Sequence, residues 1–426
     1  STSSSGEAQA QAQAQGEEAL IPGLPDEVAL SCLLRLPYST QATARAVCKA
    51  WRRLLTSRAA YLEARRRLRL TRPWLVVLAS HRATRKLQWQ ACELSGRGGA
   101  WHILSPMPDP LGPGSGSGSG PGYGPGSGYG PDPDPLCPSG FGCVAGPRAS
   151  DDSALFVCGG IRSSGTEPLD SLLRFDLFTN TWSALGPMST PRSFFACAAI
   201  GPEIYVAGGN NHNHNNHNNH NNNNQNEPTS ADTARFFGTS AEAYDPASDT
   251  WRPIASMRAS MARYDSAVLR GKLHVTEGWA WPFLASPRGE VYDPGTDAWE
   301  CMPAAMREGW TGLSVVHRDT LYVISEHDSS KLKAFDTESG SWRDLGGSPM
   351  PAHMELPICV NAIFDHELIL VVVAKNLHVA LGTLSGDPGT TPDPHGNPMH
   401  SVDWQSILAP SILIRFPRRT FGLASS

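Results

Sequence analysis

One short phrase returns four times in this chain and limits the possible fold more than any other feature. An aromatic residue and Asp are followed by Trp six positions after the Asp, in RFDLFTNTW (174–182), AYDPASDTW (243–251), VYDPGTDAW (291–299) and AFDTESGSW (334–342). A spacing that is kept four times indicates an internal repeat.

The residues around each phrase also repeat. Before it stand two apolar, strand-like runs, such as FFACAAIG (194–201) and IYVAGG (204–209), and after the Trp comes a turn with Pro or Met. Each unit therefore reads as four short strands separated by turn residues. The tryptophans at 251, 299 and 342 are 48 and 43 residues apart. Four strands in about 50 residues are typical of a β-propeller blade.

The order of a glycine doublet, the aromatic–Asp pair and the Trp resembles the kelch repeat. The doublets are Gly159–Gly160 and Gly208–Gly209, where a Cβ would hinder a tight turn after a strand. Each aromatic ring buries on the order of 200 Å², which would fill the wedge between neighbouring sheets. Later units replace the doublet by Glu277–Gly278 and Ser325–Glu326, so those turns depart from the kelch pattern.

Two degenerate units, 74–107 and 358–384, flank the clear ones. The run SILIRF (411–416) has no unit of its own, and we expect it to supply the missing strand beside the first unit and to close the ring. The sequence thus predicts a mainly β protein, a six-bladed kelch-type β-propeller over 73–418, with low-complexity inserts at 109–140 and 210–230. The blades are counted by Trp101, Trp182, Trp251, Trp299, Trp342 and Trp404.

Residues 20–66 do not fit a propeller and predict a small all-α domain. Pro25 stands before Asp26 and Glu27, which is typical of a helix start. The stretches LPDEV, LLRLP and AVCKAWRRLL resemble the F-box motif. That resemblance implies binding to the Skp-family adaptor of cullin–RING ubiquitin ligases through Leu24, Pro25, Val28, Leu33, Leu36, Val47 and Trp51. The alternative is that several of these side chains only hold the small helices together.

An F-box followed by kelch units, with VTEGWAWPF, REGWTG and NLHVALGTL, looks like the plant F-box/kelch-repeat proteins. The resemblance implies a non-catalytic substrate receptor of an SCF-type ubiquitin ligase, whose propeller binds an unidentified target protein. Alternatives are a scaffold that does not promote degradation and, formally, a propeller enzyme. Arg and Trp are favoured at binding hot spots. The candidate target contacts are Arg192, Arg263, Arg307, Trp279, Trp281, Phe283 and Trp310; alternatively, these arginines pair internally and the aromatics pack between blades.

Charge is uneven along the chain. The net charge is −5, yet residues 35–72 carry eleven Lys or Arg and one acid, so this segment is +10 and the remainder −15. The segment lacks the interleaved aromatics of a single-strand binder, so we expect a solvated helical face and no nucleic acid partner.

Metal, cofactor and catalytic sites are not expected. His212, His214, His217 and His220 lie in an Asn-rich insert with nothing to orient them as ligands. No serine hydrolase, zinc protease or phosphate-loop motif occurs. The strongly apolar run 368–374 has seven residues, against about 20 for a membrane span, so no membrane partner is expected. With residues 1–19 as a disordered tail, we expect a cytoplasmic or nuclear protein.

Overall fold

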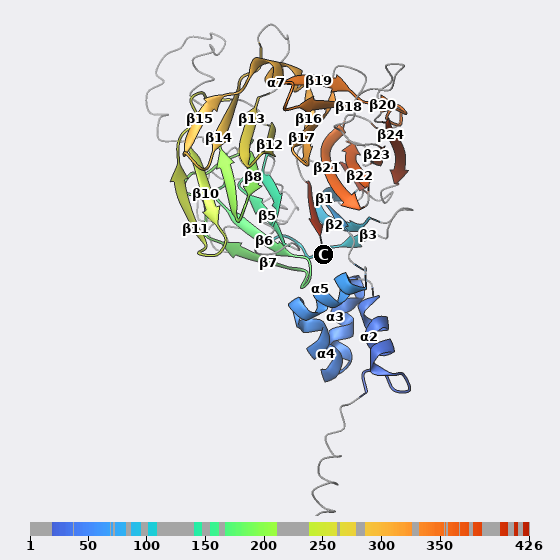
Figure 1. The fold of residues 1–426 in the computed structure, drawn as a ribbon. Coiled ribbons are helices and arrows are strands. Elements are labelled where there is room, and N and C mark those ends of the chain that lie inside the picture. The colour runs from blue at the N-terminus through green and yellow to red at the C-terminus, as the bar shows by residue number, and fades with distance from the viewer. Residues whose placement is uncertain are drawn as a thin grey trace, which may run out of the picture. The chain divides into compact units, whose positions relative to one another are not determined.

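The computed structural model divides the chain into two compact units, Ser1–Arg72 and Pro73–Ser425, which we call the head and the propeller. Its elements are labelled in Figure 1. The structure describes residues 19–36, 38–68, 70, 73–81, 87–94, 101–108, 140–146, 154–161, 167–210, 238–261, 265–277, 286–325, 332–352, 354, 357–365, 367–374, 378–385, 401–407, 413–415 and 421–425. Residues 1–18 of the predicted tail and most of the two inserts lie outside these residues.

The head consists of α2 (Asp26–Leu34), α3 (Tyr38–Val47), α4 (Lys49–Thr56) and α5 (Arg58–Arg67). Pro25 is the residue before α2, and Asp26 and Glu27 occupy its first turn, where acids interact favourably with the helix dipole. The head has its own small core, built from buried side chains of all four helices: Ala29, Leu33, Leu34, Ala44, Leu55 and Tyr61.

A buried arginine joins the ends of two helices in the head. Arg65 is 5% exposed and donates from Nη1 to the carbonyl oxygen of Leu34 and from Nη2 to that of Leu70, both at 2.7 Å. Leu34 is the last residue of α2, so the guanidinium satisfies a carbonyl that the helix itself leaves free.

The propeller is built of six sheets, which confirms the predicted fold class. Strands within a sheet are antiparallel neighbours, apart from the parallel contact of β20 with β24. Blade one contains β1 (Pro73–His81), β2 (Leu87–Glu93), β3 (Trp101–Ile103), β25 (Leu413–Arg415) and β26 (Phe421–Ser425), and blade two contains β4 (Gly142–Ala145), β5 (Ala154–Cys158), β6 (Leu172–Asp176) and β7 (Thr181–Leu185). Blade three contains β8 (Ala196–Ile200), β9 (Glu203–Ala207), β10 (Ala241–Asp245) and β11 (Thr250–Ile254), and blade four contains β12 (Asp265–Leu269), β13 (Lys272–Thr276), β14 (Gly289–Asp293) and β15 (Ala298–Cys301). Blade five contains β16 (Gly312–His317), β17 (Thr320–Ser325), β18 (Leu332–Asp336) and β19 (Ser341–Asp344), and blade six contains β20 (Gly346–Gly347), β21 (Pro357–Asp365), β22 (Glu367–Ala374), β23 (Val379–Ser385) and β24 (Ser401–Ile407). A short helix, α7 (Ala304–Gly309), links blades four and five.

The six sheets form a closed ring. The innermost strands β26, β4, β8, β12, β16 and β21 touch one another in that order, and β21 in turn touches β26. The hydrophobic core is divided among the spaces between neighbouring blades. One such cluster joins the first blade to the last, since Leu75 and Val77 of β1 pack with Val371 and Val373 of β22.

Ring closure differs from the prediction in one respect. Within the expected run 411–416, β25 pairs only with Ser80 and His81 at the end of β1. The strand β26, which lies beyond the predicted boundary at 418, pairs with β1 from Pro73 to Val77. Its sequence FGLAS has few strand-forming residues, so the pattern of the sequence does not mark it.

The structure explains why the aromatic–Asp–Trp phrase repeats. In blades two to five the Trp lies opposite the aromatic residue of the phrase on the neighbouring strand, with ring centroids 4.8–5.1 Å apart. The Trp indole then donates to a backbone carbonyl in the segment that precedes its own blade. These four bonds are Trp182 to Ser105 (2.9 Å), Trp251 to Gly186 (2.8 Å), Trp299 to Ala255 (2.7 Å) and Trp342 to Ala305 (2.9 Å).

The Asp of the phrase caps the turn between the third and fourth strands. Its side chain accepts a hydrogen bond from the backbone N–H two residues later, as Asp245 does from Ala247 at 2.9 Å. Such local bonds are the reason that Asp favours turns. Equivalent bonds are Asp176 to Phe178, Asp293 to Gly295 and Asp336 to Glu338.

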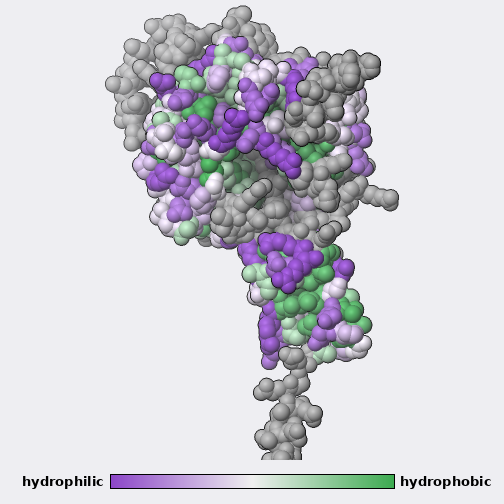
Figure 2. Space-filling model, viewed as in Figure 1, coloured by the Kyte–Doolittle hydropathy of each residue, from purple (hydrophilic) through white to green (hydrophobic). Residues whose placement is uncertain are grey.

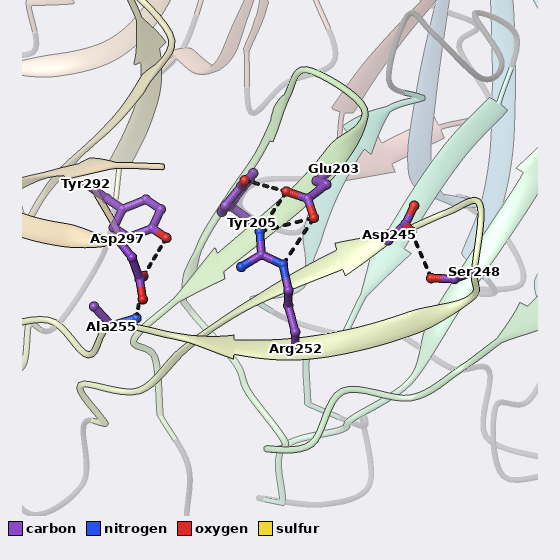
Figure 3. A network of polar contacts seen from close by, with 8 residues as sticks. All are labelled: Glu203, Tyr205, Asp245, Ser248, Arg252, Ala255, Tyr292 and Asp297. Atoms are coloured by element: carbon purple, nitrogen blue, oxygen red, sulfur yellow. Dashed lines mark hydrogen bonds and ion pairs between the residues drawn. The ribbon is translucent and has the colours of Figure 1, made fainter. Parts of the chain in front are cut away.

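A further repeated residue ties each of three blades to the segment before it. Asn180, Asp249 and Asp297 stand two residues before the Trp and have φ between 48° and 55°, a conformation that Asn and Asp tolerate. Their Oδ1 atoms accept the N–H of the preceding connector at 2.8–2.9 Å. Figure 3 shows Asp297 between the Ala255 N–H and the Tyr292 hydroxyl. In blade five Gly340 takes this position.

The glycine doublets have the conformations that the sequence predicts. All four glycines have positive φ, between 55° and 102°. A Cβ on Gly159 would lie 2.5 Å from the carbonyl oxygen of Arg192, and one on Gly209 would lie 2.7 Å from that of Ser193. These turns therefore admit no side chain without displacing the backbone.

Candidate interaction surfaces

The head carries apolar side chains on its surface although its own core is complete. Leu24, Val28 and Val47 are 40%, 47% and 60% exposed, and Pro25 is exposed as well. Figure 2 shows a large hydrophobic area on this unit. Val28 lies on α2, whose buried residues are Ala29, Leu33 and Leu34, so this helix is apolar on more than the side that packs. An exposed apolar surface of this kind marks a contact site for another molecule.

The other predicted adaptor contacts are placed differently. Leu33 is 1% exposed and packs inside the head, which favours a role in holding the helices together over the predicted adaptor contact. Leu36 and Trp51 are half-buried. The Trp51 indole donates to the carbonyl oxygen of Leu20 at 2.6 Å, which holds the segment before α2 against α4. The open alternative, that some of these residues hold the helices together, thus applies to Leu33 and to the indole N–H of Trp51.

Arg192 is not a surface residue, which corrects its prediction as a target contact. It is 1% exposed and forms a salt bridge of 2.8 Å with Glu242, which is itself 3% exposed. Its guanidinium also donates to the carbonyl oxygens of Gly208 (2.9 Å) and Ser240 (2.7 Å). Burial favours a higher pKa for Glu242, but the bonds from Arg192 and the Ser189 N–H outweigh burial and lower that pKa.

Trp310 is also a core residue and not a target contact. It is 1% exposed and belongs to the hydrophobic cluster between blades four and five. Its indole N–H donates to Asp265 Oδ2 at 3.0 Å, and the same oxygen accepts the Ser314 hydroxyl at 2.8 Å. The aromatic ring therefore packs between blades, which was the alternative that the sequence left open.

The remaining predicted target contacts stay predictions. Arg307 is half-buried on α7, so part of its side chain reaches the surface. Arg263, Trp279, Trp281 and Phe283 lie outside the residues that the structure describes.

The structure adds one exposed aromatic that sequence analysis missed. Phe194 is 38% exposed, stands two residues before the innermost strand β8 and has a φ of 54°, which is unusual for a bulky residue. Its N–H donates to the carbonyl oxygen of Gly140 at 2.7 Å, and its ring leaves no room for a Cβ on Gly140. Strained residues cluster at functional sites. In the sequence, SFFACAA reads as an ordinary strand, so nothing marked this residue.

The described residues include no group of three or more His, Cys, Asp or Glu side chains that could hold a metal ion, and the predicted His-rich tract lies outside them. Within the same described part of the chain, no helix has the length and apolar character needed to cross a membrane.

Comparison with known proteins agrees with this geometry. The F-box domain family matches residues 21–62, and the kelch motif family matches residues 149–189. An F-box/kelch-repeat protein of Arabidopsis thaliana is 38% identical over 86% of this chain and 79% of the relative. This chain belongs to the plant F-box/kelch-repeat protein family. The F-box protein AFR, also of Arabidopsis thaliana, is 32% identical over 94% of this chain and 91% of its own.

Membership of this family connects the two units with a general role. F-box/kelch-repeat proteins serve as substrate-adaptor subunits of ubiquitin ligases and generally carry no catalytic activity of their own. The family thus implies that an F-box binds a Skp-type adaptor and that a kelch propeller binds a target protein.

Proposed function

We propose that this chain is the substrate-recognition subunit of an SCF-type ubiquitin ligase. The head binds a Skp-family adaptor, and through it a cullin–RING ligase, while the propeller binds a target protein for ubiquitination and degradation. Ubiquitin transfer then results from proximity, because the ligase holds the bound target near the activated ubiquitin. This role also implies that the chain acts in the cytoplasm or the nucleus.

The observation that carries the proposal is the exposed apolar set Leu24, Val28 and Val47 on a head that already has a core. Apolar surface that the adaptor covers contributes about 25 cal/mol per Å² to binding. A variant that loses this contribution should therefore bind the adaptor measurably more weakly. The variant Val28→Asp/Val47→Asp should lose co-purification with the adaptor. Ile103→Asp is the matched control, because Ile103 is also exposed, at 62%, but lies on the propeller.

Helicity of the head, measured by circular dichroism, should be unchanged in the Val28→Asp/Val47→Asp variant. If that variant still binds the adaptor as tightly as the Ile103→Asp control, the proposed contact is wrong. The same pair of variants separates a receptor from a non-degradative scaffold. A target that accumulates in cells with the adaptor-deficient variant supports degradation, whereas an unchanged level supports the scaffold.

The target is proposed to contact the propeller near Phe194 and Arg307. Phe194 supplies an exposed ring in a strained conformation, and Arg307 supplies a partly exposed guanidinium. Both residue types offer large contact areas to a protein partner. Proximity labelling with the intact chain and with a Phe194→Ala/Arg307→Ala variant should give different sets of labelled proteins. Identical sets would exclude this part of the surface.

A further inference from the structure

Lysine is rare in this chain although arginine is common. The sequence contains 29 arginines and six lysines, and no lysine occurs between residues 87 and 271. Lysine is ordinarily among the commonest residues of soluble domains. The six lysines are Lys49, Lys86, Lys272, Lys331, Lys333 and Lys375.

Side-chain geometry explains some of the arginines. Arg192 makes several buried bonds that a lysine could not reproduce. Arg252 holds both carboxylate oxygens of Glu203, as Figure 3 shows, and Arg288 does the same with Glu277. A planar guanidinium matches a carboxylate in this way, whereas an ammonium acts as a point charge.

Other arginines lie exposed on the propeller, where a charge in solvent does not require the planar shape of a guanidinium. Arg258 is exposed, and its Nη1 lies 3.7 Å from the sulfur of Cys301. Arg270 is exposed in the turn after β12 and donates to the Thr337 hydroxyl. Arg318 is exposed in the turn after β16. A lysine ammonium is at least as well hydrated as a guanidinium at such positions.

The lysines that the structure describes offer few reactive amines on the propeller. Lys272 Nζ forms an ion pair of 2.8 Å with Asp293, and the hydrogen bond and charge of that carboxylate raise the pKa of Lys272. Its amine therefore favours the protonated form more than that of an ordinary lysine, and a protonated amine does not act as a nucleophile. Lys333 lies half-buried on β18. Lys49 is exposed, but it lies on α4 of the head.

We propose that arginine in place of lysine on the propeller protects this chain from ubiquitin transfer to itself, an inference that rests on the proposed function. In the transfer step a neutral lysine Nζ attacks the carbonyl carbon of the thioester between the ubiquitin C-terminus and the cysteine of a ubiquitin-conjugating enzyme. The C–N bond forms, the C–S bond breaks, and the cysteine sulfur leaves and takes up the proton that the amine loses. Arginine cannot act as this acceptor, because its guanidinium stays protonated.

Proximity makes such protection necessary in a receptor. An assembled ligase presents the activated ubiquitin to its own receptor at all times, and to a target only while the target is bound. Tethering raises the effective concentration of every exposed amine on the receptor to the order of millimolar. Each exposed lysine on the propeller would thus compete with the lysines of the target.

The test reconstitutes ubiquitination with the full chain, the adaptor, a cullin–RING ligase, activating and conjugating enzymes, and ubiquitin. Wild type is compared with Arg258→Lys/Arg270→Lys/Arg318→Lys, which keeps every positive charge and should melt at the same temperature. We expect the lysine variant to be modified severalfold faster, with ubiquitin mapped to the three new lysines. The slower modification of wild type should map to its own six lysines.

A lysine-bearing peptide appended to wild type serves as the positive control for ligase activity. If the appended lysines are modified but the variant is modified no faster than untagged wild type, the protective role is refuted. The protective role is also refuted if untagged wild type is modified as fast as wild type that carries the appended peptide. If the appended lysines also remain unmodified although the adaptor is bound, the proposed ligase function fails, and the inference fails with it.

Discussion

Replacing Arg192 by Met tests whether this residue belongs to the core or to the target surface. The change keeps much of the side-chain volume but removes the cation from a buried pair with Glu242. Glu242 would retain the N–H groups of Ser189 and Thr190, at 2.8 and 3.1 Å, as its remaining hydrogen-bond donors. Breaking one side of a buried ion pair costs about 3–5 kcal/mol, so we expect a loss of this size in the free energy of unfolding.

The assay is urea denaturation followed by Trp fluorescence, for Arg192→Met, Glu242→Gln and the double variant. Because the two residues contact each other, the double variant should lose less than the two single losses added together, with a coupling energy of about 0.5–3 kcal/mol. The pKa of Glu242 is lowered in the folded protein. The contribution of the pair is therefore complete above the unfolded value near 4.5 and is lost as pH falls through the folded pKa.

An Arg192→Met variant as stable as wild type would refute the reasoning. If that variant instead lost target binding at unchanged stability, Arg192 would be a surface contact after all. Arg258→Met is the matched control, since Arg258 is exposed and its substitution should change stability by no more than about 0.5 kcal/mol.

Three further predictions concern the propeller. Trp251→Phe keeps an aromatic ring but removes the N–H that binds the Gly186 carbonyl, so denaturation should show a loss of about 1 kcal/mol, and none if that bond is unimportant. Burial lowers the pKa of His274 below its usual 6.5, so the unfolded chain takes up the proton first and stability falls as pH drops below about 6.5. His274→Gln should reduce this acid sensitivity in pH-dependent melting; an unchanged pH profile would contradict it. Gly209→Ala places a Cβ 2.7 Å from the Ser193 oxygen at a φ of 94°, and should cost more than about 1 kcal/mol, whereas wild-type melting would show that the turn relaxes freely.

The fold was largely predictable because its signals are local and repeated. The Asp that caps a turn and the Trp that lies opposite an aromatic act within one hairpin, and their spacing is visible in the sequence. Asn180 and Asp249 also stand at a fixed place in the repeated phrase. Their hydrogen bonds to the preceding connector were not predicted, because these bonds join segments far apart in the chain. The strand β26 was not predicted, because only its backbone pairing with β1, and no pattern in its sequence, identifies it as a strand.

The interaction surfaces were less predictable, because exposure depends on the whole fold. Arg192 and Arg307 stand at similar places in the repeat, yet one is buried against a carboxylate and the other is half-buried on α7. What distinguishes them is Glu242, which lies 50 residues after Arg192, so the repeat alone does not reveal the pairing. Phe194 is identified only by its exposure and its backbone angle.

The pairing of β25 and β26 with β1 has a consequence for synthesis of the chain. One edge of β1 can pair with β2 as soon as β2 is made, but the other edge must wait for β25 and β26 until residues 413–425 have left the ribosome, more than 330 residues later. Until then β1 presents an open strand edge, which is prone to pair wrongly with other chains. A frameshift or stop codon late in the coding sequence would therefore leave an open ring, and chaperones would need to shield that edge throughout translation.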